Sequence, residues 1–164
     1  MIDRLLFAMT LFSALGTGLM AGLFFAFSSF VMAALGRLPP AGGIAAMQSI
    51  NVAVLNPLFF AAFLGPAVAC VLLAVAALLR WSEPGAFSLL AGGVLYLVGG
   101  PLVTMLFNLP LNNALAAVAP DSDDGARLWH RYLSDWTAWN HVRTTATLAA
   151  AASFTVALLP AWRI

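Results

Sequence analysis

This chain of 164 residues has no lysine, one cysteine and few charged side chains of either sign. Only 8% of its residues are charged, whereas 63% are hydrophobic. Soluble domains carry about 25% charged residues, so this composition excludes a soluble globular protein and indicates an integral membrane protein. Because the net charge is only +1 and the arginines form no cluster, we expect no binding to nucleic acid.

The single cysteine restricts the chemistry further. Cys70 lies within an apolar run, and one cysteine cannot form an intramolecular disulfide. A metal–thiolate cluster is equally disfavoured, because such clusters need several cysteines. We therefore expect Cys70 to be a small buried hydrophobic residue.

Four apolar runs are long enough to form membrane spans. A helix needs about 20 apolar residues to cross the hydrocarbon core, and the runs cover residues 5–35, 57–79, 86–107 and 138–162. The first run is much longer than the roughly 7–15 residues of a signal-peptide core, so we expect an uncleaved span. The sequence predicts an all-α fold, an integral membrane four-helix bundle with one domain over residues 1–164.

Proline, glycine and asparagine mark the limits of these runs. Asn56-Pro57 is typical of a helix start. Helical spacing predicts a short helix at 44–54, either in the membrane interface or as an extension into the second span. A second interfacial helix is predicted at 126–135, before the fourth span. Two sets of small residues, Ala14-Gly18-Gly22-Ala26 and Gly92-Gly93-Gly99-Gly100, thin the first and third spans. Such residues permit close helix packing, and those of the third span could equally leave room for a ligand.

The polar residues gather at one side of the predicted bundle. Four spans place both termini on one side of the membrane, so the opposite side receives the end of span one, the start of span two, the end of span three and the start of span four. The uncommon polar residues fall there: Ser28, Ser29, Gln48, Asn51, Asn56, Asn108, Asn112, Asn113, Asn140, His141 and Arg143. Polar groups within a membrane are costly, so this convergence predicts a functional site.

Helical spacing identifies one face of the last helix. Trp129, Tyr132, Trp136, Asn140 and Arg143 recur every three or four residues and therefore share a face. An aromatic belt with a snorkelling arginine is the alternative interpretation. The two histidines, His130 and His141, would be about 16 Å apart on a continuous helix, which argues against a mononuclear metal site.

Several motifs resemble those of the anthrone oxygenase-like family, small four-helix membrane proteins that are mostly bacterial. The matching segments are GLFFAFS at 22–28, MQSIN at 47–51, Asn56-Pro57, NLPLN at 108–112 and WNHVRT at 139–144. Position 109 is Leu where Val is more common in the family. Fungal members are similar to enzymes that oxidise an anthrone to an anthraquinone with molecular oxygen.

The resemblance implies an oxygenase-like enzyme acting on a flat lipophilic aromatic of the anthrone, phenol or quinol type. His141 would be the general base, and Arg143 with Asn140 would bind the developing oxyanion. The residues expected to bind the substrate are Asn51, Asn56, Asn108, Asn112, Trp136, Trp139, Phe25 and Ser28. Molecular oxygen would be the co-substrate. No metal ligand and no organic cofactor is predicted, although the sequence leaves a metal or haem open.

Two other functions stay open at this stage. The chain could be a non-catalytic membrane protein that binds or transports a lipophilic small molecule or assists a partner enzyme, or its asparagines could serve only to cap and bridge helices. The expected location is the bacterial cytoplasmic membrane, with cytoplasmic termini and the lipid bilayer as partner. The arginines are spread too evenly for the positive-inside rule to decide the orientation, and the sequence leaves the oligomeric state open.

Overall fold

The computed structural model describes residues 2–159 and contains only helices and connecting turns in that range. Three helical segments are long and apolar enough to cross a membrane, namely Arg4–Leu35, Pro57–Leu79 and Ala86–Ala116. The predicted all-α class is therefore confirmed, and these segments identify an integral membrane protein.

The first long segment is continuous although its winding changes. It consists of α1 (Ile2–Ala26), the π-helical turn η1 (Phe27–Val31) and α2 (Met32–Leu35). A short turn then leads into α3 (Pro40–Ala53), which has a proline at its first position. The Gln48 amide nitrogen holds α3 in place by donating to the backbone oxygens of Leu115, at 2.8 Å, and Val118, at 3.1 Å.

The second and third segments form a pair joined by a tight turn. α4 (Pro57–Leu79) begins where the sequence predicted, because the Asn56 side chain accepts a hydrogen bond from the Phe59 amide at 3.0 Å. The turn after α4 ends at Gly85, whose φ of 88° favours glycine. α5 (Ala86–Leu97), η2 (Val98–Leu102), η3 (Thr104–Asn108) and α6 (Leu109–Ala116) then follow as one rod, which extends past the predicted end at 107.

The last helix corrects one prediction, that of a separate helix at residues 126–135. α7 (Asp123–Leu158) is a single helix of 36 residues, so residues 126–135 are its first turns and not a separate interfacial helix. Ser122 caps it by accepting a hydrogen bond from the Gly125 amide at 3.0 Å, which stabilises the helix start well before Asp135. Within the described range α7 is not among the candidate spans, since its hydroxyl-bearing residues, His141 and Arg143 lower its hydropathy. The predicted fourth span, 138–162, also extends beyond the described residues.

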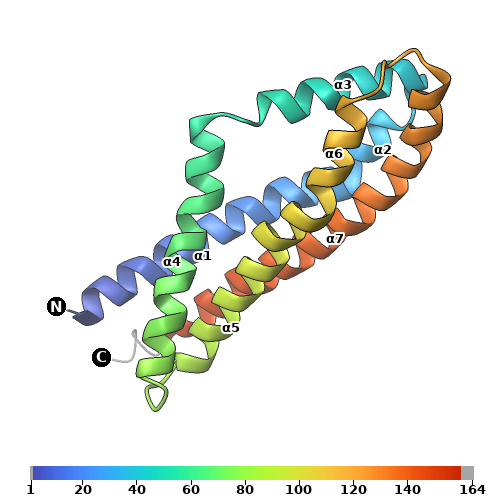
Figure 1. The fold of residues 1–164 in the computed structure, drawn as a ribbon. Helices are drawn as coiled ribbons and strands as arrows, with labels where there is room; N and C mark the ends of the chain where they lie inside the picture. Colours follow the sequence, from blue (N-terminus) through green and yellow to red (C-terminus); the bar gives the residue numbers. More distant parts are fainter. Residues whose placement is uncertain (1, 160–164) are drawn as a thin grey trace.

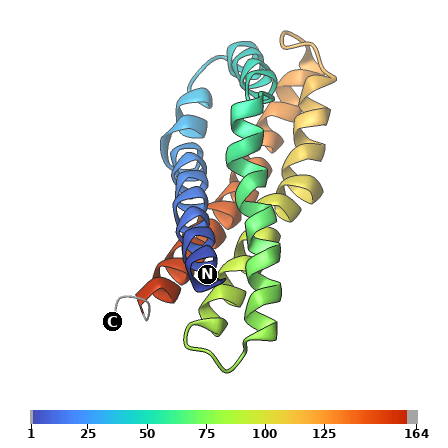
Figure 2. The same cartoon turned by 90° about the vertical axis from the view of Figure 1, so that its left-hand side faces the viewer.

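The long helices lie side by side. α1 and α5 each pack against both α4 and α7, as Figures 1 and 2 show. The N-terminus, the end of α7 and the turn between α4 and α5 lie at one end of the molecule, whereas α3 crosses the other end (Figure 1). Glycine permits the closest approaches: a Cβ atom added to Gly16 would overlap Pro66, and one added to Gly99 would overlap Ala146.

Two apolar clusters fill the interior, and they meet near the middle of α7. The cluster nearer the termini comprises Met20, Phe24, Phe63, Cys70, Leu73, Tyr96, Ala150 and Phe154. The cluster beneath α3 comprises Met32, Leu35, Ile44, Met47, Leu115, Trp129, Tyr132 and Trp136. Cys70 is buried, as predicted. The Arg143 guanidinium contacts Phe24 of the first cluster and Trp136 of the second, and it therefore lies at their junction.

Candidate active site

One face of α7 forms the base of the site. Trp129, Tyr132, Trp136, Asn140 and Arg143 are all buried, which confirms the face predicted from their spacing. The aromatic rings stack along the helix, with centroids 5.6 Å apart for Trp129 and Tyr132 and 6.0 Å apart for Tyr132 and Trp136. This stack leads directly to Asn140 and Arg143.

Asn140 connects α7 to the first helical segment. Its amide nitrogen donates to the Phe24 backbone oxygen at 2.7 Å and to the Ser28 hydroxyl at 2.8 Å. The Ser28 hydroxyl also forms a hydrogen bond of 2.9 Å with the Thr144 hydroxyl. These contacts use both donors of the fully buried amide, whereas its oxygen has no partner among the described residues.

Asn108 makes a similar contact with α7 from the rod that begins with α5. It lies in η3, and its fully buried side chain donates to the Trp136 backbone oxygen at 3.2 Å. Its amide oxygen likewise finds no partner within the described chain. A buried polar atom without a hydrogen bond costs about 1–3 kcal/mol, so these two oxygens each lack a donor that no described residue supplies.

Asn112 fixes the aromatic stack one turn further along. Its side-chain oxygen accepts from the Tyr132 hydroxyl at 2.7 Å and from the Trp136 indole nitrogen at 2.8 Å. Burial raises the pKa of Tyr132, and a hydrogen bond with the Asn51 side chain lowers it by a smaller amount. The phenol therefore stays protonated at neutral pH and can donate to Asn112.

Arg143 is a charged residue that lies in the apolar interior. Its side chain is 6% exposed, and its Cζ lies 3.7 Å from the centroid of the Phe24 ring and 5.9 Å from that of Trp136. Such cation–π contacts are favourable, yet buried charges normally pair with an opposite charge. No carboxylate pairs with Arg143 in the described part of the chain, and its Nε atom has no hydrogen-bond partner there. The site therefore offers a donor for a negatively charged or strongly accepting oxygen.

Three π-helical turns lie against this part of α7. η1 carries Ser28, η3 carries Asn108, and η2 places Gly99 and Gly100 next to Ala146 and Thr147. π-Helical turns are rare and often mark functional sites. They contact α7 between Trp136 and Thr147, and this observation is independent of the unpartnered atoms.

The structure brings together most of the predicted site residues but leaves three outside. His141 is exposed, although its neighbour Asn140 is fully buried, because successive helix residues point in different directions. Phe25 is 59% exposed, whereas Phe24 is 2% exposed and contacts Arg143. Asn56 is exposed and occupied as the cap of α4.

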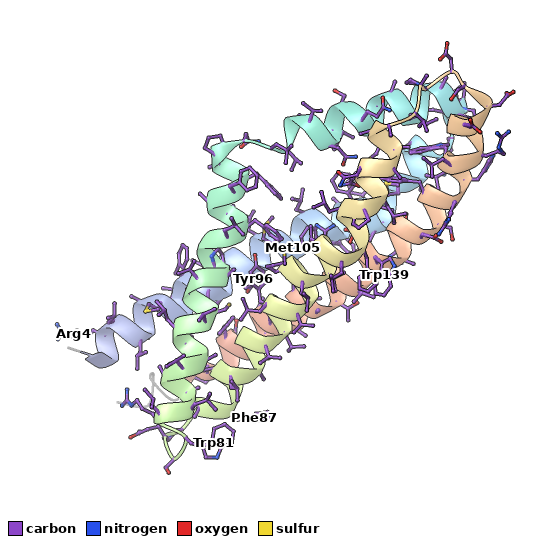
Figure 3. All side chains as sticks on the ribbon, in the orientation of Figure 1. Arg4, Trp81, Phe87, Tyr96, Met105 and Trp139 are labelled. Atoms are coloured by element: carbon purple, nitrogen blue, oxygen red, sulfur yellow. The ribbon has the colours of Figure 1, made fainter. Side chains whose placement is uncertain are left out.

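Trp139 takes an intermediate place. It is half-buried and stacks on Phe107, with centroids 3.5 Å apart and planes 8° apart, at the side of α7 (Figure 3). Phe24 and Thr144 also contact the site residues, although neither was predicted to belong to the site. Spacing could have found Phe24 and Thr144, which lie four residues from Ser28 and Asn140, respectively, on the same helix faces.

No group of three or more His, Cys, Asp or Glu side chains suited to a metal ion occurs in residues 2–159. The polar groups at the site are instead amides, hydroxyls and one guanidinium. Such groups recognise oxygen atoms by hydrogen bonding and stabilise negative charge as it develops.

Comparison with known proteins identifies the family. No curated protein and no solved structure matches the chain. The family described as anthrone oxygenase matches residues 58–153, which are more than half of the chain. This range includes Asn108, Asn112, Asn140 and Arg143, whereas Phe24 and Ser28 precede it. The chain therefore belongs to the anthrone oxygenase family.

Proposed function

We propose that the protein is a membrane-embedded oxygenase-like enzyme that oxidises a flat lipophilic aromatic of the anthrone, phenol or quinol type with molecular oxygen. The observation that carries this proposal is the buried guanidinium of Arg143, which has no carboxylate partner among the described residues. The unpartnered oxygens of Asn108 and Asn140 support it. Family membership supplies the reaction class.

We further propose that the C-terminal half of α7 is a fourth membrane span, so that the chain forms a four-helix bundle in the bacterial cytoplasmic membrane with cytoplasmic termini. Two findings support this placement. α7 packs against α1 and α5, which both belong to candidate spans. In addition, the hydroxyls of Thr145 and Thr155 donate to backbone oxygens four residues earlier, which satisfies them where water is absent.

In this mechanism Arg143 acts on the carbonyl oxygen of the substrate. Loss of a ring methylene proton turns an anthrone into a phenolate-like anion, and the guanidinium stabilises the negative charge on the oxygen. Asn108 and Asn140 would accept hydrogen bonds from substrate hydroxyl groups. Phe24 and Trp136, which already flank Arg143, would face the aromatic ring. Because the structure places His141 outside this group, we assign the departing proton to water.

The reaction balances with oxygen as the oxidant. The anion gives two electrons to O₂ as a carbon–oxygen bond forms, and protonation yields a hydroperoxide. Cleavage of the O–O bond with loss of the remaining hydrogen on that carbon releases water and leaves a second carbonyl. One anthrone and one O₂ therefore give one anthraquinone and one water.

Oxygen uptake by the purified protein in lipid nanodiscs tests this function. With anthrone as substrate, we expect quinone formation above the rate in protein-free nanodiscs. Arg143→Gln should lower the rate by about 100-fold or more, as expected for loss of an oxyanion donor. Thr145→Val, which alters an exposed hydroxyl on the same helix, should leave the rate unchanged.

Helix content and thermal unfolding of both variants provide the folding control. Wild-type protein that binds anthraquinone but never raises the rate above the background would overturn the enzymatic proposal and favour a binding or transport function. Full activity in Arg143→Gln would remove Arg143 from the mechanism.

A further inference from the structure

A groove opens between the end of the first helical segment and α7, beside the buried network. It has a volume of about 390 Å³ and is lined by Ser28, Met32, Ala33, Gly36, Arg37, Leu133 and Thr137. The groove is open rather than enclosed, so a bound molecule would be covered on one side only. The apolar side chains suit a hydrophobic body, and the remaining ones provide hydroxyl groups and one positive charge.

Thr137 differs from every other threonine of the chain. A threonine within a helix can bond the backbone oxygen four residues earlier. The threonines that do so here are Thr10, Thr17, Thr104, Thr144, Thr145, Thr147 and Thr155. The Thr137 hydroxyl is inaccessible to solvent and has no partner in the described chain. Because the Thr137 side chain lines the groove, a rotation about χ1 would bring this unpaired donor to a bound ligand.

Arg37 gives the groove its charge. No acidic side chain lines the groove, and Arg37 forms no ion pair in the part of the chain that the structure describes. The other arginines at this end differ, since Arg127 pairs with Asp124 and Arg131 pairs with Asp135. Arg37 is thus available to bind an anionic group.

Ser28 links the groove to the buried network. Its side chain lines the groove, while its hydroxyl accepts from Asn140 and bonds with Thr144. One side chain therefore belongs both to the groove and to the network around Arg143. A molecule in the groove lies next to the site without crossing another layer of the protein.

We propose that this groove binds a flat aromatic carrying an acidic group, such as an aromatic carboxylate. The charge would lie at Arg37, the ring against Ala33 and Leu133, and an acceptor oxygen at the Thr137 hydroxyl. The inference rests on the proposed function in one respect only, because it takes this aromatic to be a substrate or product of the adjoining site.

Binding of anthraquinone-2-carboxylate to the full-length protein tests the inference, with 2-methylanthraquinone as its uncharged counterpart. Affinity is measured by tryptophan fluorescence quenching in phosphatidylcholine nanodiscs. Arg37→Gln should weaken binding of the carboxylate about tenfold, the scale of one charge-assisted hydrogen bond, and leave the methyl compound unchanged. Thr137→Val should weaken the carboxylate several-fold.

Two variants serve as matched controls. Arg127→Gln removes an exposed arginine at the same end, and Thr145→Val removes an exposed threonine hydroxyl of the same helix; neither should alter binding. Equal losses in Arg37→Gln and Arg127→Gln would overturn the inference in favour of diffuse surface charge. Loss of binding when phosphatidylglycerol replaces phosphatidylcholine would overturn it in favour of a lipid headgroup.

The two proposals can fail separately. If the variants show the expected pattern but wild-type protein consumes no oxygen with an anthrone, the groove stands and the oxygenase function fails. If oxygen uptake is present but Arg37→Gln binds the carboxylate as tightly as wild type, the groove inference fails alone.

Discussion

At the scale of single residues, the direction of a side chain decides its role more than its position in a motif. His141 and Arg143 belong to the same Trp-Asn-His-Val-Arg segment, yet two residues correspond to about 200° around a helix. Arg143 accordingly lies in the interior, while His141 is exposed. Histidine is a common general base, but here it cannot reach the atoms that Arg143 contacts.

The exposed position of His141 leads to a prediction opposite to the catalytic role that the family resemblance implies. His141→Gln should keep anthrone-dependent oxygen uptake within about twofold of wild type, because a base that does not touch the reacting atoms contributes little. Asn140→Leu should abolish uptake, since it removes the contacts to Phe24 and Ser28. A large loss in His141→Gln, with unchanged thermal unfolding, would return the histidine to the mechanism.

The sequence predicts which site residues share a face only within a single helix. Spacing alone places Trp129 through Arg143 on one face, and all five residues are buried. The choice between Phe24 and Phe25 could not be made in this way, because phenylalanines crowd both sides of α1. It depends on how α1 is rotated against α7, which contacts between distant residues determine.

At the scale of helices, glycine sets the distance between α7 and the rod that begins with α5. A Cβ added to Gly99 would overlap Ala146, whereas one added to Gly22 would meet no atom within 4 Å. Gly99→Ala should therefore lower the unfolding free energy by about 1–3 kcal/mol, the usual cost of overpacking. Gly22→Ala should be neutral or stabilise the protein by up to about 1 kcal/mol.

Thermal unfolding in detergent, followed by loss of helical circular dichroism, measures both variants. Gly99→Ala should also reduce oxygen uptake, because Gly99 lies in η2 beside the site. Unchanged stability in Gly99→Ala would show that the two helices can separate slightly at no cost.

The helix limits were more predictable than the winding within them. Asn56-Pro57 gave the start of α4 correctly, since a cap and a proline act locally. Residues 126–135 are continuous with the rest of α7, because Ser122 starts the helix and no proline or glycine interrupts it after Gly125. Proline gave a local signal for two π-helical turns, since η2 contains Pro101 and Pro110 cannot bond the carbonyl of residue 106 in η3. η1 contains no proline.

At the scale of the whole molecule, the helices place the α4–α5 turn and the loop before α7 at opposite ends (Figure 2). Under the proposed topology these ends lie on opposite sides of the membrane. A cysteine introduced as Asp121→Cys should react with a membrane-impermeant maleimide in intact cells, and Ser82→Cys only after permeabilisation. Cys70 should not interfere, because it is buried. Labelling of both positions from the same side would contradict a single crossing by the α5–α6 rod.

The stacked rings of Trp129, Tyr132 and Trp136 have an optical consequence. Aromatic rings held at fixed distances and angles, here 5.6–6.0 Å and 15–20°, couple electronically and produce strong circular dichroism in the near ultraviolet. That signal disappears when tertiary packing loosens, even where helices persist. Since Asn112 binds two of these rings, a change in the amide bonding should alter the spectrum. Near-ultraviolet circular dichroism can therefore monitor the packing of the site in protein that has neither ligand nor substrate.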